Sequence, residues 1–111
     1  MKLLLALICC FGVGFSHAAS VTDATIQIVA TQDDGSANGW FWIRVNTSFT
    51  ALPACHTAPT DRVAWDLSIP VSKYSYGIAM SAHVSGKRVN VDTHDTCFNG
   101  YAKVRNIYFS P

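Results

Sequence analysis

The sequence predicts a small, mainly β domain with one helix, in the order strand, strand, strand, helix, strand, strand. Three observations support this class. Apolar and polar residues alternate with a period of two in five separate segments. The segment between Pro70 and Gly86 changes to a helical period. Clusters of turn-forming residues separate most of these segments, and residues 20–111 have room for one compact domain with one modest core.

Residues 1–19 are expected to be a secretory signal peptide and not part of this domain. Lys2 precedes an apolar run, and small residues follow it at Ser16, Ala18 and Ala19. The run is shorter than the ~20 apolar residues that a membrane-spanning helix needs. We therefore expect cleavage after Ala18 or Ala19, a secreted or periplasmic location, and no stable insertion in a membrane.

The first two predicted strands form a hairpin with a longer loop. The first strand runs from Ala24 to Thr31, the turn-rich loop from Gln32 to Gly39, and the second strand from Trp40 to Thr47. The residues expected to face the core are Ile26, Ile28 and Ala30 on the first strand, and Phe41, Ile43 and Val45 on the second.

The third strand and the helix follow. Arg62 to Ser68 alternates, with Val63, Trp65 and Leu67 predicted to face inward. The helix between Pro70 and Gly86 is expected to begin at a Ser68 or Ser72 cap and to end at Gly86, a residue suited to the left-handed conformation. Its predicted core stripe consists of Val71, Tyr74, Ile78 and Ala82.

The last two strands complete the order. Lys87 to Thr93 has Val89 and Val91 inward, and Ala102 to Ser110 changes phase, which predicts a β-bulge near Arg105 and Asn106. Five strands with a helix after the third is the order of the OB-fold barrel, so a small OB-like barrel is expected. The alternative is an open antiparallel sheet with one packed helix.

Cysteine usage fits an exported domain. Cys9 and Cys10 leave with the signal peptide, and Cys55 and Cys97 are expected to form a disulfide. Closing that loop stabilises the domain by about 3–4 kcal/mol in the chain-entropy model. Two thiolates with His56 and His94 would also suffice for a tetrahedral zinc ion, but the spacing fits no familiar zinc motif, so no metal site is predicted.

The outward face of the second strand is the strongest candidate for ligand binding. It carries Trp40, Trp42, Arg44 and Asn46. Indole rings stack on the C–H faces of sugars, while arginine and asparagine supply directed hydrogen bonds. The alternative is that the tryptophans pack beneath the loop from Ala51 to Asp61 or at a subunit interface.

A second apolar line on the helix, formed by Tyr76, Met80 and Val84, predicts contact with another copy of the chain. A helix packed on one sheet needs only one apolar stripe. Chance scatter of apolar residues in a small hydrophobic protein is the competing explanation. We expect a homo-oligomer.

Charge and motifs exclude several functions. The formal net charge is +1, and Lys2 belongs to the predicted leader, so no attraction to nucleic acid is expected. Asp92, His94 and Asp95 lack an accompanying nucleophile, there is no G-x-S-x-G motif, and Glu is absent. No catalytic residue, enzyme activity or cofactor is predicted.

The stretch SGKRVNV after the helix and the final CFNGYAKVRNIYF resemble small secreted bacterial proteins related to toxin-type B subunits. That resemblance implies an OB-fold domain that assembles into rings, usually pentamers, and binds host glycans. It assigns no sugar-contact position in this chain. The expected function is therefore an exported binding protein for a glycan or another surface ligand. The alternative is a secreted or periplasmic inhibitor of a hydrolase, such as a lysozyme-type enzyme, acting through the Ala51 to Asp61 loop.

Overall fold

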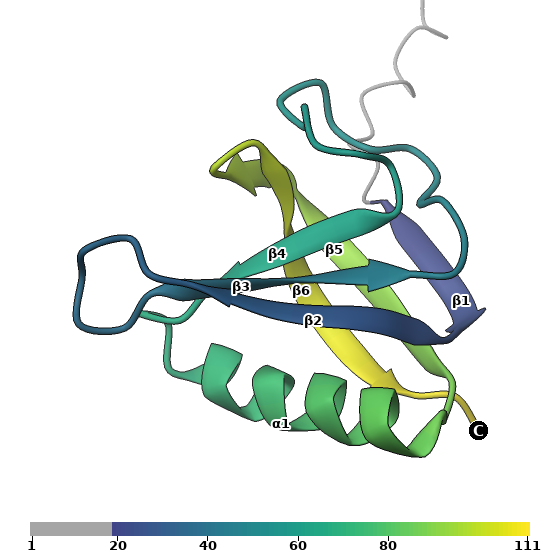
Figure 1. Cartoon of the computed structure of the whole chain (residues 1–111). Coiled ribbons are helices and arrows are strands. Elements are labelled where there is room, and N and C mark those ends of the chain that lie inside the picture. The colour runs from purple at the N-terminus through teal and green to yellow at the C-terminus, as the bar shows by residue number, and fades with distance from the viewer. Residues whose placement is uncertain (1–18) are drawn as a thin grey trace, which may run out of the picture.

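The computed structural model describes residues 19–111, so the predicted signal peptide lies outside the described residues except for Ala19. The described chain forms six strands and one helix (Figure 1). The elements are β1 (Ser20–Ala24), β2 (Ile26–Gln32), β3 (Trp40–Val45), β4 (Arg62–Asp66), α1 (Val71–Ser85), β5 (Val89–Phe98) and β6 (Tyr101–Phe109).

All six strands belong to one sheet, in the order β1-β5-β6-β4-β3-β2. Neighbouring strands are antiparallel except for β4 and β6, which are parallel. The prediction of a mainly β fold with one helix is confirmed. The sheet is open and does not close into the expected OB-like barrel, so the alternative of an open sheet with one packed helix is confirmed, with β4 and β6 as a parallel pair.

The two edge strands explain why the sheet curls without closing. β1 and β2 are separated only by Thr25, so the two edges of the sheet approach each other where the chain bends. Asp23 just before this point has a φ of 54°, and the β1–β5 register shifts between Val21 and Ala24. A covalent bend therefore joins the edges where a closed barrel would have a ladder of hydrogen bonds. β1 itself was not predicted.

The predicted strands that correspond to β3, β4 and β5 bury the expected residues. The predicted strand that corresponds to β2 does not. Phe41, Ile43 and Val45 are buried, as are the inward residues of β4 and β5. In β2 the register with β3 shifts between Ile26 and Ile28. This bulge reverses the alternation, so that Val29 packs against the core. The prediction that Ile28 and Ala30 face the core is therefore wrong.

The C-terminal hairpin is longer than predicted. β5 continues past Thr93 to Phe98, where a loop was expected, and pairs with β6 to its end. The predicted bulge in β6 is confirmed, because the register passes from Asp92↔Asn106 to Thr93↔Val104 and leaves Arg105 as the extra residue.

The helix has the predicted bounds, and its predicted core face is right at Ile78 and Ala82 but wrong at Val71 and Tyr74. It ends at Gly86, whose φ of 74° and hydrogen bond to the Ala82 carbonyl confirm the predicted stop. Its N-cap is Pro70, without a side-chain hydrogen bond, so the predicted serine cap is wrong. Ser72, Ala79 and Ala82 are buried while Val71 and Tyr74 are exposed, because small residues let the helix approach the sheet closely.

The core lies between α1 and the concave face of the sheet (Figure 1). Its centre is an aromatic group in which Phe41 stacks on Trp65 at 4.3 Å and meets Tyr76 edge-on at 5.0 Å. Within residues 19–111, the structure contains no helix with the length and apolar character required to span a membrane.

Candidate functional site

The outward face of β3 holds the predicted aromatic residues in half-buried positions. Trp40, Trp42 and Arg44 alternate with the buried core residues of the strand, which confirms that they share one face. Ala64 lies opposite Trp42 on β4 and is fully buried, although it is outside the inner core cluster. Large side chains therefore cover the small residue at the centre of this outer surface.

The additional covering side chains come from the tip of the β5–β6 hairpin. Asn99 and Gly100 both have positive φ, as in the type I′ turn that joins twisted antiparallel strands tightly, and they pair Phe98 with Tyr101. Tyr101 lies 5.4 Å from the Trp40 ring and 6.2 Å from the Trp42 ring, measured between ring centroids.

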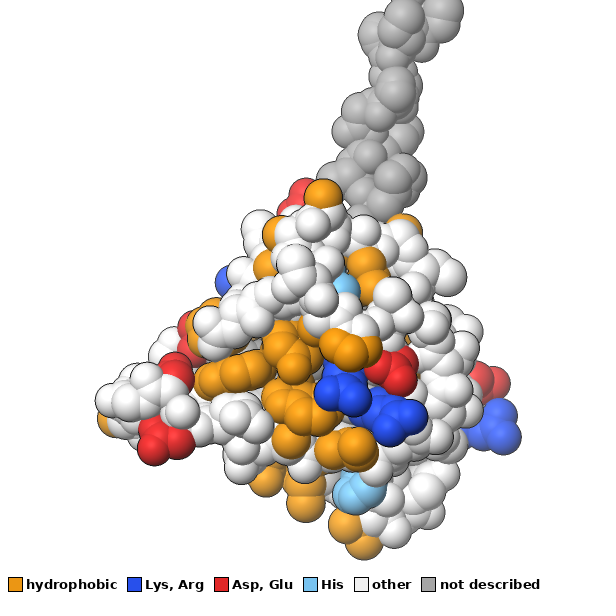
Figure 2. Space-filling view, turned by 45° about the horizontal axis from the view of Figure 1, so that its top comes forward, with side chains coloured by type: hydrophobic (Ala, Val, Ile, Leu, Met, Phe, Trp, Pro, Cys, Tyr) orange, Lys and Arg blue, Asp and Glu red, His pale blue; other side chains and the backbone are white. Residues whose placement is uncertain are grey.

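Phe98 meets the same Trp40 ring edge-on at 5.7 Å. We refer to Trp40, Trp42, Phe98 and Tyr101 as the aromatic face. Figure 2 shows hydrophobic side chains gathered on one side of the molecule, with cationic and acidic side chains at their border. This surface is a continuous apolar platform with a charged margin.

The charged margin consists of Arg44, Asp61 and Arg62. The Arg62 guanidinium lies 4.8 Å from the Trp42 ring centroid, in a cation–π contact. Arg44 Nε donates to Asp61 Oδ2 at 3.2 Å, whereas Arg62 Nε is 3.6 Å from Asp61 Oδ1, too far for a hydrogen bond. Among the described residues, the Nη groups of both arginines make no hydrogen bond, so they are free to donate to a ligand.

Asn46 has a structural contact that was not anticipated. It follows the end of β3, its Oδ1 accepts a hydrogen bond from the Thr25 N–H, and its own N–H donates to the Thr25 carbonyl. These two bonds fasten the bend between β1 and β2. The side chain of Asn46 therefore holds the fold at the end of the strand that carries Trp40, Trp42 and Arg44.

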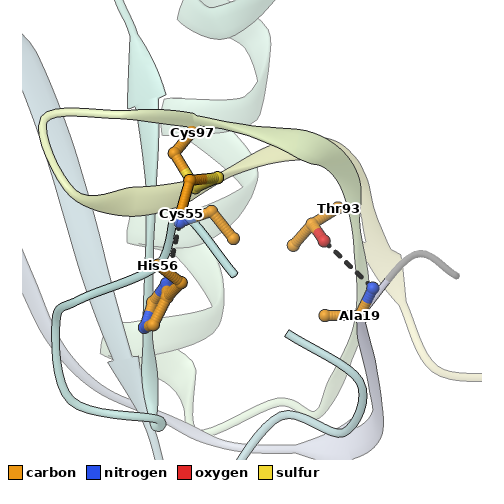
Figure 3. The surroundings of a disulfide bond; sticks show 6 residues. Ala19, Cys55, His56, Thr93 and Cys97 are labelled. Atoms are coloured by element: carbon orange, nitrogen blue, oxygen red, sulfur yellow. Dashed lines mark hydrogen bonds between the residues drawn. A yellow bond between two sulfur atoms is a disulfide. The ribbon is translucent and has the colours of Figure 1, made fainter. Parts of the chain in front are cut away.

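The loop between β3 and β4 is fastened to the hairpin tip beside the aromatic face. The predicted disulfide is confirmed between Cys55 in the loop and Cys97 in β5 (Figure 3). His56 Nδ1 accepts the Ala102 N–H at 2.8 Å, so the ring carries its proton on Nε2, which donates to the Pro59 carbonyl. The Gly100 carbonyl accepts the N–H groups of two loop residues, Thr57 and Ala58.

The disulfide also decides between the two roles considered for the cysteines. Both sulfurs are bonded to each other, so neither is a thiolate ligand for zinc, and both nitrogens of His56 are hydrogen-bonded. Within residues 19–111, no group of three or more His, Cys, Asp or Glu side chains is arranged to hold a metal ion.

Two carboxylates, one in the β2–β3 loop and one in β5, have local partners. The hydroxyl of Ser36, followed by its backbone N–H, lowers the pKa of Asp34 in the β2–β3 loop. Asp92 Oδ1 accepts hydrogen bonds from Arg105 Nε and Asn106 Nδ2. Each contact stabilises its own turn or strand pair.

The residues predicted to form an interface between copies differ in exposure. Tyr76 is half-buried and packs on Phe41 within the same chain, and Met80 is also half-buried. Val84 is 78% exposed. Among these three, Val84 offers the most free surface to a second copy.

The sequence reasoning missed Phe98, Tyr101 and Arg62 as members of this site. The signal that identifies the first two is the Asn99–Gly100 pair, because this dipeptide marks a two-residue hairpin turn and places its flanking residues opposite each other. Arg62 follows from the antiparallel register, in which it pairs with Arg44.

The arrangement offers two features that bind a ligand. Half-buried aromatic rings offer a flat apolar surface, and the guanidinium groups at its margin offer directed donors, which is the combination that recognises a ligand with apolar faces and polar edges. Comparison with models of protein families gave no match to this chain, and no curated protein matched it.

Proposed function

We propose that the protein is an exported binding protein that recognises a glycan or another surface ligand through the aromatic face, as an oligomer similar to toxin-type B subunits. The observation that carries this proposal is the cluster of Trp40, Trp42 and Tyr101 beside Arg62. Pyranose rings have apolar C–H faces and polar hydroxyl edges, and this cluster matches both.

The strand pairing supports the resemblance. When β1 and β2 are counted as one strand bent at Thr25, the chain has five strands with a helix after the third. OB-fold domains are partly open barrels that bind oligosaccharides on their second and third strands and on the loops between strands one and two and strands four and five. In this chain those positions are β3, β4, residues 33–39 and the Asn99–Gly100 turn, which carry or border the aromatic face.

We expect the substitution Trp42→Ala to weaken ligand binding about tenfold or more, because it removes the ring that lies between Tyr101 of the aromatic face and the Arg62 cation. A glycan array identifies the bound structure, and isothermal titration with that glycan measures the change in dissociation constant.

The matched control is Tyr74→Ala. Tyr74 is an aromatic residue that is 77% exposed on α1, which packs against the opposite side of the sheet. This variant should bind as the wild type does. Equal binding by the Trp42→Ala variant, with an unchanged melting temperature, would refute the assignment of the aromatic face.

Self-association is the second part of the proposal. The exposed side chain of Val84 and the half-buried side chain of Met80 are available on α1, whereas Tyr76 also serves the core. Because α1 packs against the concave side of the sheet, contact between copies through this helix leaves the aromatic face open. Native mass measurement of the sample used for binding separates an oligomer from a single chain.

Export predicts a specific mature N-terminus, Ala19. Cleavage after Ala18 leaves small residues at the last and third-last positions of the leader, Ser16 and Ala18. Ala19 itself is fully buried, its N–H donates to Thr93 Oγ1 at 3.1 Å, and its carbonyl accepts the Thr93 N–H at 2.9 Å (Figure 3). We expect intact-mass spectrometry of the exported protein to give a chain that begins at Ala19.

A chain that begins at Ser20 serves as the comparison. It leaves the buried hydroxyl and N–H of Thr93 without these partners, which costs about 1–3 kcal/mol. Urea unfolding of the two chains measures this difference. Equal stability would show that Ala19 is dispensable to the fold.

The loop favours one alternative, inhibition of a secreted or periplasmic hydrolase. Its attachment through the disulfide, His56 and Gly100 holds the exposed residues near Ala54 in a fixed shape, and such pre-organised loops lose little entropy when they bind. Stoichiometric inhibition of a lysozyme-type enzyme that is lost in Ala54→Arg but kept in Trp42→Ala would favour this function over glycan binding.

A further inference from the structure

A pocket opens on the molecule where β4 and β6 separate above the beginning of α1. The two parallel strands pair only at Ala64 and Lys103. Beyond this pair the strands diverge, and the pocket between them has a volume of about 110 Å³. Its polar lining comes from β4, α1, β5 and β6, and consists of Asp66, Ser72, Ser75, His94, Lys103 and Arg105.

Ser72 is the most informative residue of this lining. It is only 3% exposed, yet its hydroxyl makes no hydrogen bond with any residue in the described range 19–111. Among the described residues, only Asp61 Oδ1 and Arg62 Nε are fully buried side-chain atoms without a partner, so the Ser72 oxygen keeps some accessible surface. Because Ser72 lines the pocket, the partner that completes its hydrogen bonding is expected inside the pocket.

The charged groups favour an anion as that partner. Lys103 is half-buried and forms no ion pair within the described residues, whereas Arg105 is held by Asp92 at 3.3 Å. The first turn of α1 contains no acidic residue, and its N-cap makes no side-chain hydrogen bond. The positive end of the helix dipole therefore adds to the charge of Lys103 at this place.

Asp66 is the one carboxylate in the lining, and one of its oxygens is hydrogen-bonded to Ser68. Its Oδ1 accepts hydrogen bonds from the N–H of Ser68 at 2.9 Å and from the Ser68 hydroxyl at 2.7 Å. These bonds hold one oxygen of Asp66 toward the turn before α1. Arg105 is already paired with Asp92, so Lys103 is the cation of the lining that has no carboxylate partner within the described residues, and a small anion fits beside it.

We propose that this pocket binds a small oxyanion group, a carboxylate, sulfate or phosphate, through Ser72, Ser75 and Lys103. The volume suits such a group, because a cavity of about 150 Å³ accommodates benzene in another protein. The site is independent of the aromatic face and of the function proposed for it.

The test is a titration of the disulfide-bonded protein followed by amide shifts in two-dimensional NMR. Sodium acetate, sulfate and phosphate are added separately at constant ionic strength, with sodium chloride as the reference. We expect saturable shifts at Ser72 and Lys103 with at least one of the three oxyanions. The substitutions Ser72→Ala and Lys103→Met should each weaken binding about tenfold, because each removes a donor to the anion.

The control is Lys87→Met, which removes a cation that lies over Phe109, outside the pocket lining. It should leave the titration unchanged. Saturable binding of one oxyanion alone identifies which chemistry the site takes. Shifts that do not saturate with any of the three, or equal affinity in Lys103→Met with an unchanged melting temperature, would overturn the proposal. Equal binding of neutral glycerol would overturn the oxyanion class.

Discussion

Replacing both Cys55 and Cys97 with serine is expected to lower the free energy of unfolding by about 4 kcal/mol. The disulfide closes a loop of 42 residues, and without it the unfolded chain regains the entropy that the bond removes. For a domain of this size the melting temperature should fall by roughly 15–30 °C. Urea unfolding at 25 °C, followed by tryptophan fluorescence, measures the change.

The single variants provide the control. The stabilisation belongs to the bond and not to either sulfur, so Cys55→Ser, Cys97→Ser and the double variant should lose about the same free energy. Reduction of the wild-type protein should give a similar loss. A double variant that loses twice as much as either single variant would instead mean that the two side chains contribute by packing.

The disulfide connects this stability to the candidate site. Cys97 lies one residue before Phe98, and Cys55 lies one residue before His56. The Nδ1 atom of His56 accepts a hydrogen bond from the Ala102 N–H. The same hairpin tip that carries Phe98 and Tyr101 is therefore held by the bond and by the loop. A loss of the disulfide should loosen the aromatic face as well as the domain.

The strand phases were predictable where one face is apolar and the other is not. Phe41, Ile43 and Val45 alternate with bulky polar or amphipathic neighbours, so only one register buries the apolar set. In β2, both Ile28 and Val29 are apolar, so the alternation fits either face, and the bulge that selects Val29 leaves no mark in the sequence. β1 offers only Val21 and Ala24 as buried residues and shows no alternation.

The helix phase could be predicted from apolarity only in part. Of the predicted stripe, Ile78 and Ala82 face the core, whereas the large residues Val71 and Tyr74 are exposed and Ala79 is buried instead, because close packing on the sheet favours small side chains. Its distance from the sheet depends on Phe41 and Tyr76 meeting between the two layers, which is a property of the assembled fold.

The candidate site was predictable only within a single strand. Alternation places Trp40, Trp42 and Arg44 on one face, but it gives no information about which distant segment covers them. Tyr101 reaches Trp42 because β6 pairs in parallel with β4, and β4 pairs with β3. Long-range strand order of this kind follows from the topology, not from local periodicity.

Phe41→Ala is expected to destabilise the domain by about 3–5 kcal/mol, the range for removing a fully buried phenylalanine. Its ring stacks on Trp65 and meets Tyr76, so truncation leaves a cavity between sheet and helix. Urea unfolding at 25 °C measures the loss, and the smaller change Phe41→Leu gives an intermediate value if Phe41→Ala does not fold.

The neighbouring variant Trp42→Ala tests whether the outer aromatic residues belong to the core or to the candidate site. It should lose ligand binding and lower the stability by less than Phe41→Ala, since Trp42 is only half-buried on the opposite face. If Trp42→Ala destabilised the domain as much as Phe41→Ala, the outer aromatic residues would be part of the core and not a surface for a ligand.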